Sequence, residues 1–115
     1  MERPAAMTDA QVVRNGTGIR VLVPAALTGN LVPAIQATLR KELAQGARQV
    51  VFDLAHTRSL DSTGVALLLA THNSVKALGG QVSLESVAPE ILHLLRTMRL
   101  VERLQAMPAT GDAHG

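Results

Sequence analysis

The sequence predicts an α/β domain in which a mixed sheet of four to five strands packs with three main helices. Two observations support this fold class. The 115 residues, 47% of them hydrophobic, suffice for one core but hardly for two. After an N-terminal hairpin, β-prone runs alternate with helical segments, which is the pattern of βαβ units. We therefore expect one domain over residues 11–107, with flexible ends at residues 1–10 and 108–115.

The first predicted element is an antiparallel hairpin over residues 11–23. The runs QVVR and IRVLV lie on either side of an Asn-Gly pair, which is typical of tight hairpin turns. In the second run Ile19, Val21 and Val23 alternate with other residues. This period of two predicts that the strand has one buried face.

A helix is predicted next, capped by Thr28 or Asn30 and extending to about Gln45, because Gly46 is a helix stop signal. Its apolar residues recur every fourth position on one face: Ile35, Leu39 and Leu43. The following run QVVFDL (residues 49–54) is β-branched and alternates little. Such a run predicts a covered strand at the centre of the sheet.

Three further elements are predicted in the second half of the chain. A helix opens at the Asp-Ser-Thr-Gly motif and ends before Gly79-Gly80, and QVSLES then alternates as a strand. Pro89 starts a third helix to about Met98, and LVERL (residues 100–104) is expected to form a short edge strand. The apolar positions of the third helical segment are expected in the core: Leu92, Leu95, Met98 and Leu100.

Composition excludes several classes of function. The chain has no Cys, so it has no disulfides, thiolate metal ligands or Cys nucleophile. It has one aromatic residue, and its nine Arg and two Lys are scattered, which argues against direct nucleic-acid binding. The four His show no metal-ligand spacing, and no phosphate-binding glycine motif is present. We expect no metal and no cofactor.

The N-terminal sequence MERPAAMTDA lacks the apolar segment of a secretory signal. The apolar run VALLLA is far too short to cross a membrane. We therefore expect a cytoplasmic protein that does not insert into membranes.

The candidate functional motif is Asp61-Ser62-Thr63-Gly64, directly before the apolar run at residues 65–70. The first three residues are all common helix N-caps, so a purely structural role is one alternative. Two features favour a binding site. The motif follows the loop after a predicted central strand, where sites collect in α/β sheets, and the first two turns of the helix have no polar face. We expect part of this apolar surface to stay exposed and to bind a partner.

Phosphorylation of Ser62 would change such a surface without unfolding the helix. A phosphoryl group adds about −1.5 to −2 charges at pH 7. The amides and dipole of a helix N-terminus tolerate an anion. At the rim of an apolar interface, however, the same charge, placed next to Asp61, opposes docking through desolvation and like-charge repulsion.

The chain resembles a STAS domain of the anti-sigma factor antagonist type from about Val12 to Leu104. The similarity is carried by VVFDLAHTRSLDSTGVALLL and by LGGQVSLESVAPEILHLLRTMRLVERL. The resemblance implies a non-enzymatic regulator whose unphosphorylated form binds an anti-sigma factor serine kinase and releases its client. It implies that Ser62 is phosphorylated and that Asp61 and Gly64 flank it as parts of the same motif. It leaves open whether a serine phosphatase removes the phosphate again.

Around Ser62, the expected partner-binding surface consists of Asp61, Ser62, Thr63, Gly64, Val65, Ala66 and Leu67. Thr63 and Ser59 remain alternative phosphate acceptors. Two departures from the family pattern stand out. The family's Gly-x-Leu-Asp reads Ala25-Ala26-Leu27-Thr28 here, without its acidic residue, and the usual C-terminal helix is missing from the sequence pattern after Met107.

Two other functions are weighed against this hypothesis. A hydrolase triad of Ser62, His56 and Asp53 is disfavoured, because the chain lacks a G-x-S-x-G motif; Asp53 is more simply a polar strand end. The other alternative keeps the resemblance to a STAS domain. It is a cytoplasmic accessory subunit of a phospholipid-transport ABC system, in which the same helix would dock an ATPase.

Overall fold

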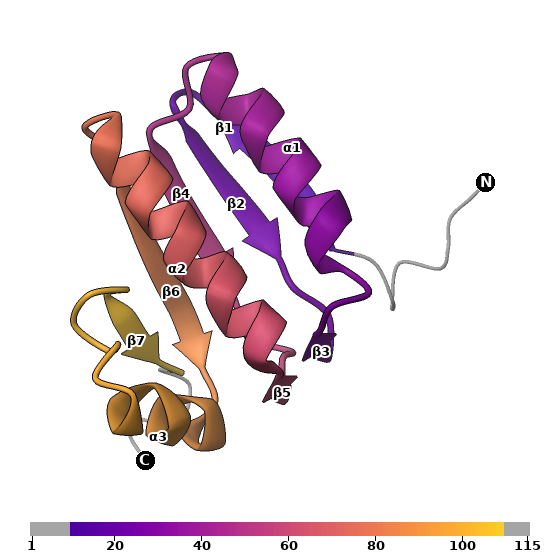
Figure 1. Cartoon of the computed structure of the whole chain (residues 1–115), viewed down its shortest axis with the longest axis vertical. Helices are drawn as coiled ribbons and strands as arrows, with labels where there is room; N and C mark the ends of the chain where they lie inside the picture. Colours follow the sequence, from indigo (N-terminus) through magenta and orange to yellow (C-terminus); the bar gives the residue numbers. More distant parts are fainter. Residues whose placement is uncertain (1–9, 110–115) are drawn as a thin grey trace.

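The computed structural model describes residues 10–109 and shows one mixed five-stranded sheet in the order β1-β2-β4-β6-β7. Antiparallel pairing joins only the first two strands, and every later neighbour is parallel. The strands of this sheet are β1 (Gln11–Asn15), β2 (Gly18–Leu22), β4 (Gln49–Asp53), β6 (Gln81–Val87) and β7 (Ala106–Pro108). The predicted fold class is confirmed, with β4 at the centre of the sheet (Figure 1).

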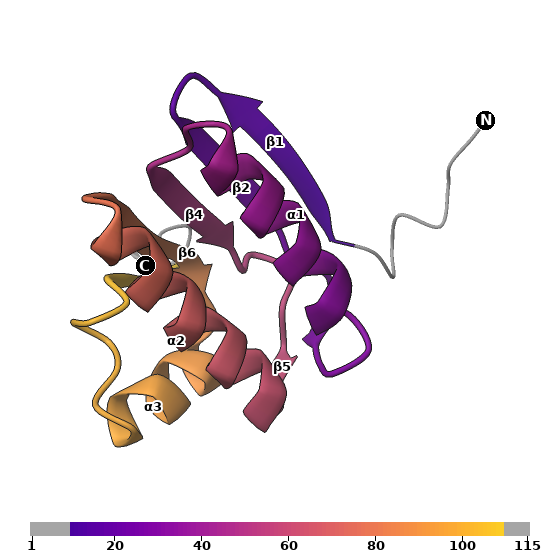
Figure 2. The same ribbon diagram turned by 45° about the horizontal axis from the view of Figure 1, so that its top comes forward.

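Three helices pack with this sheet, namely α1 (Val32–Ala44), α2 (Ser62–Ala77) and α3 (Pro89–Thr97). In both views α1 and α2 lie side by side on the same face of the sheet (Figure 1 and Figure 2). The third helix lies at the end of the sheet where β6 ends (Figure 1). The N-terminus of α2 lies at that same end, so the Asp-Ser-Thr-Gly motif follows the carboxyl ends of the parallel strands.

The core lies between the sheet and the two helices that cover it. Alternate residues of the strands point into it and are fully or almost fully buried: Ile19, Val21, Val50, Phe52, Val82 and Leu84. The helices contribute Ile35 and Leu39 from α1 and Leu67 and Leu68 from α2. Aliphatic side chains thus fill the core around the single aromatic ring of Phe52, as the composition predicted.

The opposite face of the sheet carries polar groups. Arg20 of β2 donates to Asp53 of β4 at 3.1 Å and to Glu85 of β6 at 2.9 Å. The hydrogen bond that Arg20 donates to Glu85 and, to a smaller extent, the charges of both carboxylates raise the pKa of Arg20. One guanidinium therefore joins three neighbouring strands on the face that α1 and α2 leave uncovered.

The hairpin turn between β1 and β2 forms as predicted, with Gly16 at a φ of +64°. The predicted caps of α1 are wrong. The cap residue is Leu31, which provides no side-chain hydrogen bond. Instead, the backbone carbonyl of Thr28 accepts from the amides of Leu31 and Val32, and a proline in the first turn needs no amide partner.

The predicted last strand is displaced along the chain. Residues 101–105 form a turn, and the edge strand is β7, which starts at Ala106. The reason is the left-handed backbone of Arg99, with a φ of +60°, which ends the α3 segment. The chain then turns, and extended backbone begins only after that turn. Met98 is also not in the core, because 45% of it is exposed, whereas Leu95 and Leu100 are buried.

Two details of organisation were not predicted. A separate parallel pair joins β3 (Ala26–Leu27) and β5 (Ser59–Leu60) beside the start of α2. The domain boundary expected at Met107 falls inside β7, and the amide of Ala109 still donates to Val87 O. The ends expected to be flexible lie outside the described residues, apart from Ala10, Pro108 and Ala109. In the described part of the chain, no helix is long and apolar enough to span a bilayer.

Candidate functional site

Asp61 is the residue that caps α2. Its backbone is extended, and its Oδ1 accepts hydrogen bonds from the Gly64 amide at 2.8 Å and the Thr63 hydroxyl at 2.6 Å. Its Oδ2 accepts from the amide of Gly29 at 3.1 Å, which ties the cap to the segment after β3. The bond from Thr63, followed by that from Gly64, lowers the pKa of Asp61. The carboxylate is therefore held ionised next to Ser62.

Ser62 is the first residue of α2 and is exposed. Its hydroxyl forms no hydrogen bond with any of residues 10–109. The neighbouring Thr63 is also exposed, but its hydroxyl is engaged with Asp61. Ser59 is exposed within β5. Of these three hydroxyl residues, Ser62 is the one that combines exposure and a helix N-terminus, whose amides favour an anion, with a hydroxyl that no described residue binds.

Gly64 is buried where the first turn of α2 crosses β3. A Cβ at this position would lie 2.4 Å from Leu27 O, so no side chain fits without a shift of backbone. The close crossing holds the start of α2 against β3, and the Asp61 amide also donates to Leu27 O. Gly64 thus fixes where Ser62 stands and is not itself on the surface.

The apolar start of α2 is mostly covered by the protein's own core. Val65 and Leu67 were expected to contact a partner, but they are only 6% and 1% exposed. Ala66 and Ala70 are exposed and Leu69 is half-buried. The expectation that part of this surface stays uncovered is therefore met by small side chains, while the large ones fill the core.

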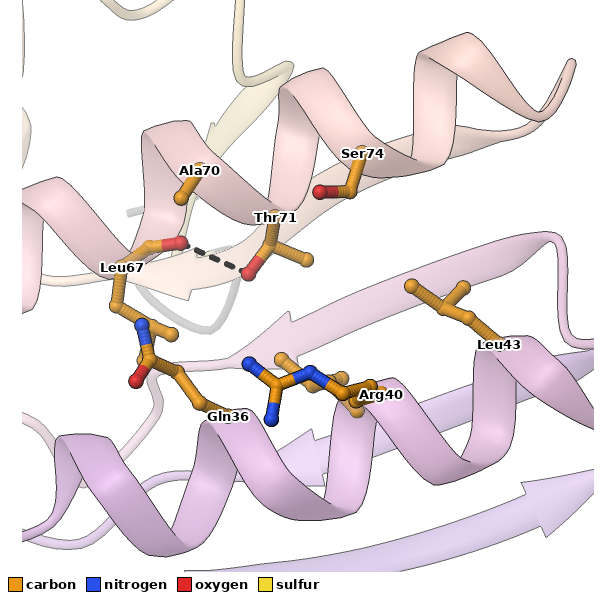
Figure 3. A pocket seen from close by; sticks show the side chains of 8 residues that line it. Gln36, Arg40, Leu43, Leu67, Ala70, Thr71 and Ser74 are labelled. Atoms are coloured by element: carbon orange, nitrogen blue, oxygen red, sulfur yellow. Dashed lines mark hydrogen bonds between the residues drawn. The ribbon is translucent and has the colours of Figure 1, made fainter.

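One exposed stripe of α2 consists of small residues at four-residue spacing: Ser62, Ala66, Ala70 and Ser74. We call this the small-residue stripe. In its second half it borders a groove of about 330 Å³ between α1 and α2 (Figure 3). Gln36 and Arg40 line the groove from α1, and Thr71 lines it from α2, with its hydroxyl donating to Leu67 O at 2.8 Å. Small side chains let a partner approach the helix closely.

The sequence pattern gave no signal for three contacts around the motif. The first is the Gly29 amide that bonds Asp61. The second is Thr57, which is fully buried and donates to the carbonyls of Val23 and Pro24 at 3.2 and 2.9 Å. The third is the carbonyl of Ala25, which accepts from the amides of residues 58 and 59. These bonds anchor the loop that leads to Ser62.

The position at which the resemblance implies an acidic residue lies close to the site. Thr28, which stands there, is half-buried after β3 and precedes Gly29. The region next to the Asp61 cap therefore carries a hydroxyl in place of a carboxylate. A partner that approached this side would meet less negative charge.

The residues of the alternative hydrolase triad do not form a triad. Asp53 accepts from Arg20 and from the amide of Ala55, and His56 is exposed in the following loop. No hydrogen bond within the described chain joins Asp53, His56 or Ser62 to one another. His93 is exposed and His72 is half-buried on their helices, and His114 lies outside the described residues.

Comparisons with known proteins agree with this fold. A model of the STAS domain matches residues 10–113. The phosphorylated form of the Bacillus cell fate determinant SpoIIAA is 20% identical, with 91% of this chain and 95% of that chain covered and a TM-score of 0.73. An anti-sigma-factor antagonist (STAS) domain protein from Planctomyces limnophilus is 24% identical, with 94% and 96% covered and a TM-score of 0.73.

A sulfate transporter family protein from Wolinella succinogenes also has this fold. It is 14% identical, with 80% of this chain and 75% of that chain covered and a TM-score of 0.69. No curated protein matches the chain significantly. At these identities the structural similarities establish a shared fold.

Proposed function

Since the chain belongs to the STAS domain family, we propose that it is an anti-sigma factor antagonist that works by partner switching. In its unphosphorylated form it binds an anti-sigma factor that is also a serine kinase, and the kinase releases its other client. Phosphorylation of Ser62 ends the binding. The protein is then a regulatory module of the cytoplasm rather than an enzyme, and a serine phosphatase would restore it.

The observation that carries this proposal is the state of the Ser62 hydroxyl. It is exposed at the first position of α2 and has no hydrogen-bond partner within residues 10–109, whereas the Thr63 hydroxyl is bound to Asp61. A kinase can therefore reach Ser62 without breaking a contact of the fold. A kinase acting on Thr63 would have to break the bond that this hydroxyl makes in the helix cap.

The geometry around the cap supports a phosphorylation that leaves the fold intact. The cap bonds of Asp61 come from Gly64, Thr63 and Gly29, and none comes from Ser62. A phosphoryl group on Ser62 would stand at the positive end of the α2 dipole, which partly offsets its repulsion by Asp61. The change is then confined to the surface.

The small-residue stripe is the surface on which the added charge would act. Ser62 lies at its end, and Ala66 and Ala70 continue it along α2 toward the groove with Arg40. A partner packed on Ala66 would bury the Ser62 position at the rim of the interface. A dianion there would lose its hydration on docking, which opposes binding.

The test is phosphoryl transfer followed by binding. With the cognate kinase and ATP, we expect one phosphate per chain at Ser62, mapped by mass spectrometry. Ser62→Ala should bind the kinase constitutively, and Ser62→Asp should bind at least roughly tenfold more weakly, as a loss of about 1.4 kcal/mol implies. Ser59→Ala, which changes another exposed serine near the motif, is the matched control and should behave like the wild type.

Two results would contradict the proposal. One is equal kinase affinity of the wild type, Ser62→Ala and Ser62→Asp. The other is binding to a transport ATPase without any phosphoryl transfer, which would instead support an accessory subunit of a transport system.

A further inference from the structure

A second cleft lies at the other end of α2 from Ser62. It is lined by residues of the C-terminal half of α2, the start of β6 and the turn at residues 101–105, and its volume is about 510 Å³. Figure 1 shows where α2 and β6 lie in the fold. Ser62 and Lys76 are fourteen positions apart on one helix, which corresponds to about 21 Å along its axis. This cleft is therefore separate from the proposed phosphorylation site. We call it the basic cleft.

Three basic side chains line the basic cleft, namely His72 and Lys76 from α2 and Arg103 from the turn. One acidic side chain, Glu102, lines it as well. Neither Lys76 nor Arg103 forms an ion pair with any described residue, whereas Arg14, Arg20 and Arg58 do. Counting Lys76, Arg103 and Glu102, the cleft carries a net charge of +1, which becomes +2 when His72 is protonated.

The charges of Lys76 and Arg103 affect the ionisation of the His72 ring. Desolvation of the half-buried ring lowers its pKa, and repulsion by Lys76 and then Arg103 lowers it further. The two cations are thus close enough to act on one imidazole from two different elements. An anion between them would reverse the repulsion and favour protonated His72.

The turn that carries Arg103 is fixed on β6. Gln105 adopts a left-handed backbone with a φ of +50°, and its side-chain amide donates to Val82 O at 3.1 Å. The Ala106 amide closes the turn by donating to Val101 O at 2.8 Å. A left-handed residue other than glycine carries strain, and such residues cluster at binding sites. Arg103 is therefore presented to the cleft by a constrained turn.

From this arrangement we propose that the basic cleft binds a small ligand that bears a phosphate group. Lys76 and Arg103 pair with the phosphate oxygens, and His72 adds a third donor when protonated. The volume exceeds what a single phosphate ion needs and falls in the range of small-molecule sites. The side chains that line it include no aromatic ring, so recognition rests on the phosphate and not on stacking.

The test is a titration of the ¹⁵N-labelled full chain with pyrophosphate, followed by NMR at constant ionic strength. We expect saturable chemical-shift changes at Lys76, Gly80 and Arg103, and a rise in the pKa of His72 at saturation, because the bound anion favours the protonated ring. Lys76→Ala and Arg103→Ala should each weaken binding about tenfold, the loss expected for one charge-assisted hydrogen bond. Glu102→Gln should strengthen binding, because it removes the opposing carboxylate.

Lys41→Ala is the matched control, since it removes a lysine from α1, whose residues do not line this cleft, and should not change affinity. Vesicles that contain phosphatidic acid form a second arm. Vesicle binding that depends on Lys76 would identify a lipid headgroup as the source of the phosphate. Two results together would overturn the proposal. The first is chemical-shift changes that do not saturate, or that are equal in the wild type and Lys76→Ala. The second is the absence of vesicle binding that depends on Lys76. Ser62 plays no part in these measurements, so this result is independent of the phosphorylation test.

Discussion

The Thr63 hydroxyl donates to Asp61 Oδ1 at 2.6 Å, so the residue directly after Ser62 is committed to the cap of α2. This bond is the largest cause of the lowered pKa of Asp61. Two adjacent hydroxyl residues thus have different roles, one structural and one exposed to solvent. The relationship also sets how the site responds to acid.

The first prediction concerns the pH dependence of this cap. The pKa of Asp61 is lowered in the folded protein, so the unfolded chain binds a proton first. The stability that Asp61 contributes is therefore complete above its ordinary pKa in the unfolded chain and is lost as pH falls through the lower folded value. Thr63→Val should raise the Asp61 pKa, measured from its ¹³C carboxyl shift.

Thr63→Ser is the control for this experiment, because it keeps the hydroxyl donor and should preserve the low pKa. An unchanged Asp61 pKa in Thr63→Val would show that the hydrogen bond does not set the ionisation of the cap.

The second prediction concerns the crossing of α2 over β3. Gly64→Ala would place a Cβ 2.4 Å from Leu27 O, and the backbone would have to move. We expect a loss of about 2 kcal/mol in the free energy of unfolding, typical of an overpacked core position, measured by urea denaturation. Gly18→Ala is the control, because its nearest contact is an ordinary 3.4 Å to Asn15 O. Equal stability of the two variants would contradict the role assigned to Gly64.

The third prediction concerns the end of α3. Arg99 has a φ of +60°, while the Leu100 amide donates to Leu95 O at 2.8 Å. Glycine adopts this conformation without a Cβ penalty, so Arg99→Gly should stabilise the protein by about 1 kcal/mol. Arg96→Gly removes the same charge inside the helix and should destabilise it by about 1 kcal/mol. Urea midpoints of both variants test the difference in sign, and a shift in the same direction would contradict it.

Much of the fold follows from local patterns in the sequence. The hairpin, the central strand β4 and all three helices were predicted because their hydrophobic periods and their Gly or Pro boundaries agree with the tertiary structure. One wrong prediction concerns a helix start at which a backbone carbonyl, and not a side chain, accepts the hydrogen bonds of the first amides. The cap residue of α1 is Leu31, and the first amides of the helix are bound by the backbone carbonyl of Thr28 and not by its hydroxyl. Likewise, nothing in LVERL signals that a left-handed Arg99 precedes it.

The candidate site was predicted in part. Exposure of Ser62 and capping by Asp61 follow from the position of the motif before a helix. The burial of Val65 and Leu67 does not follow from the sequence. A helix without a polar face can bury its large residues in the core if its exposed side carries alanines. The bond between Gly29 and Asp61 joins segments thirty-two residues apart, which no local pattern encodes.

Phe52, fully buried in the middle of β4, is the only aromatic residue among Phe, Tyr and Trp in the whole chain. The protein therefore has almost no absorbance at 280 nm and no intrinsic tryptophan emission. A single Trp placed at the exposed Gln36, on the α1 wall of the groove between α1 and α2 and outside the small-residue stripe, would be the only Trp in the molecule. Its fluorescence would then report contact with a Trp-free partner without any background to subtract.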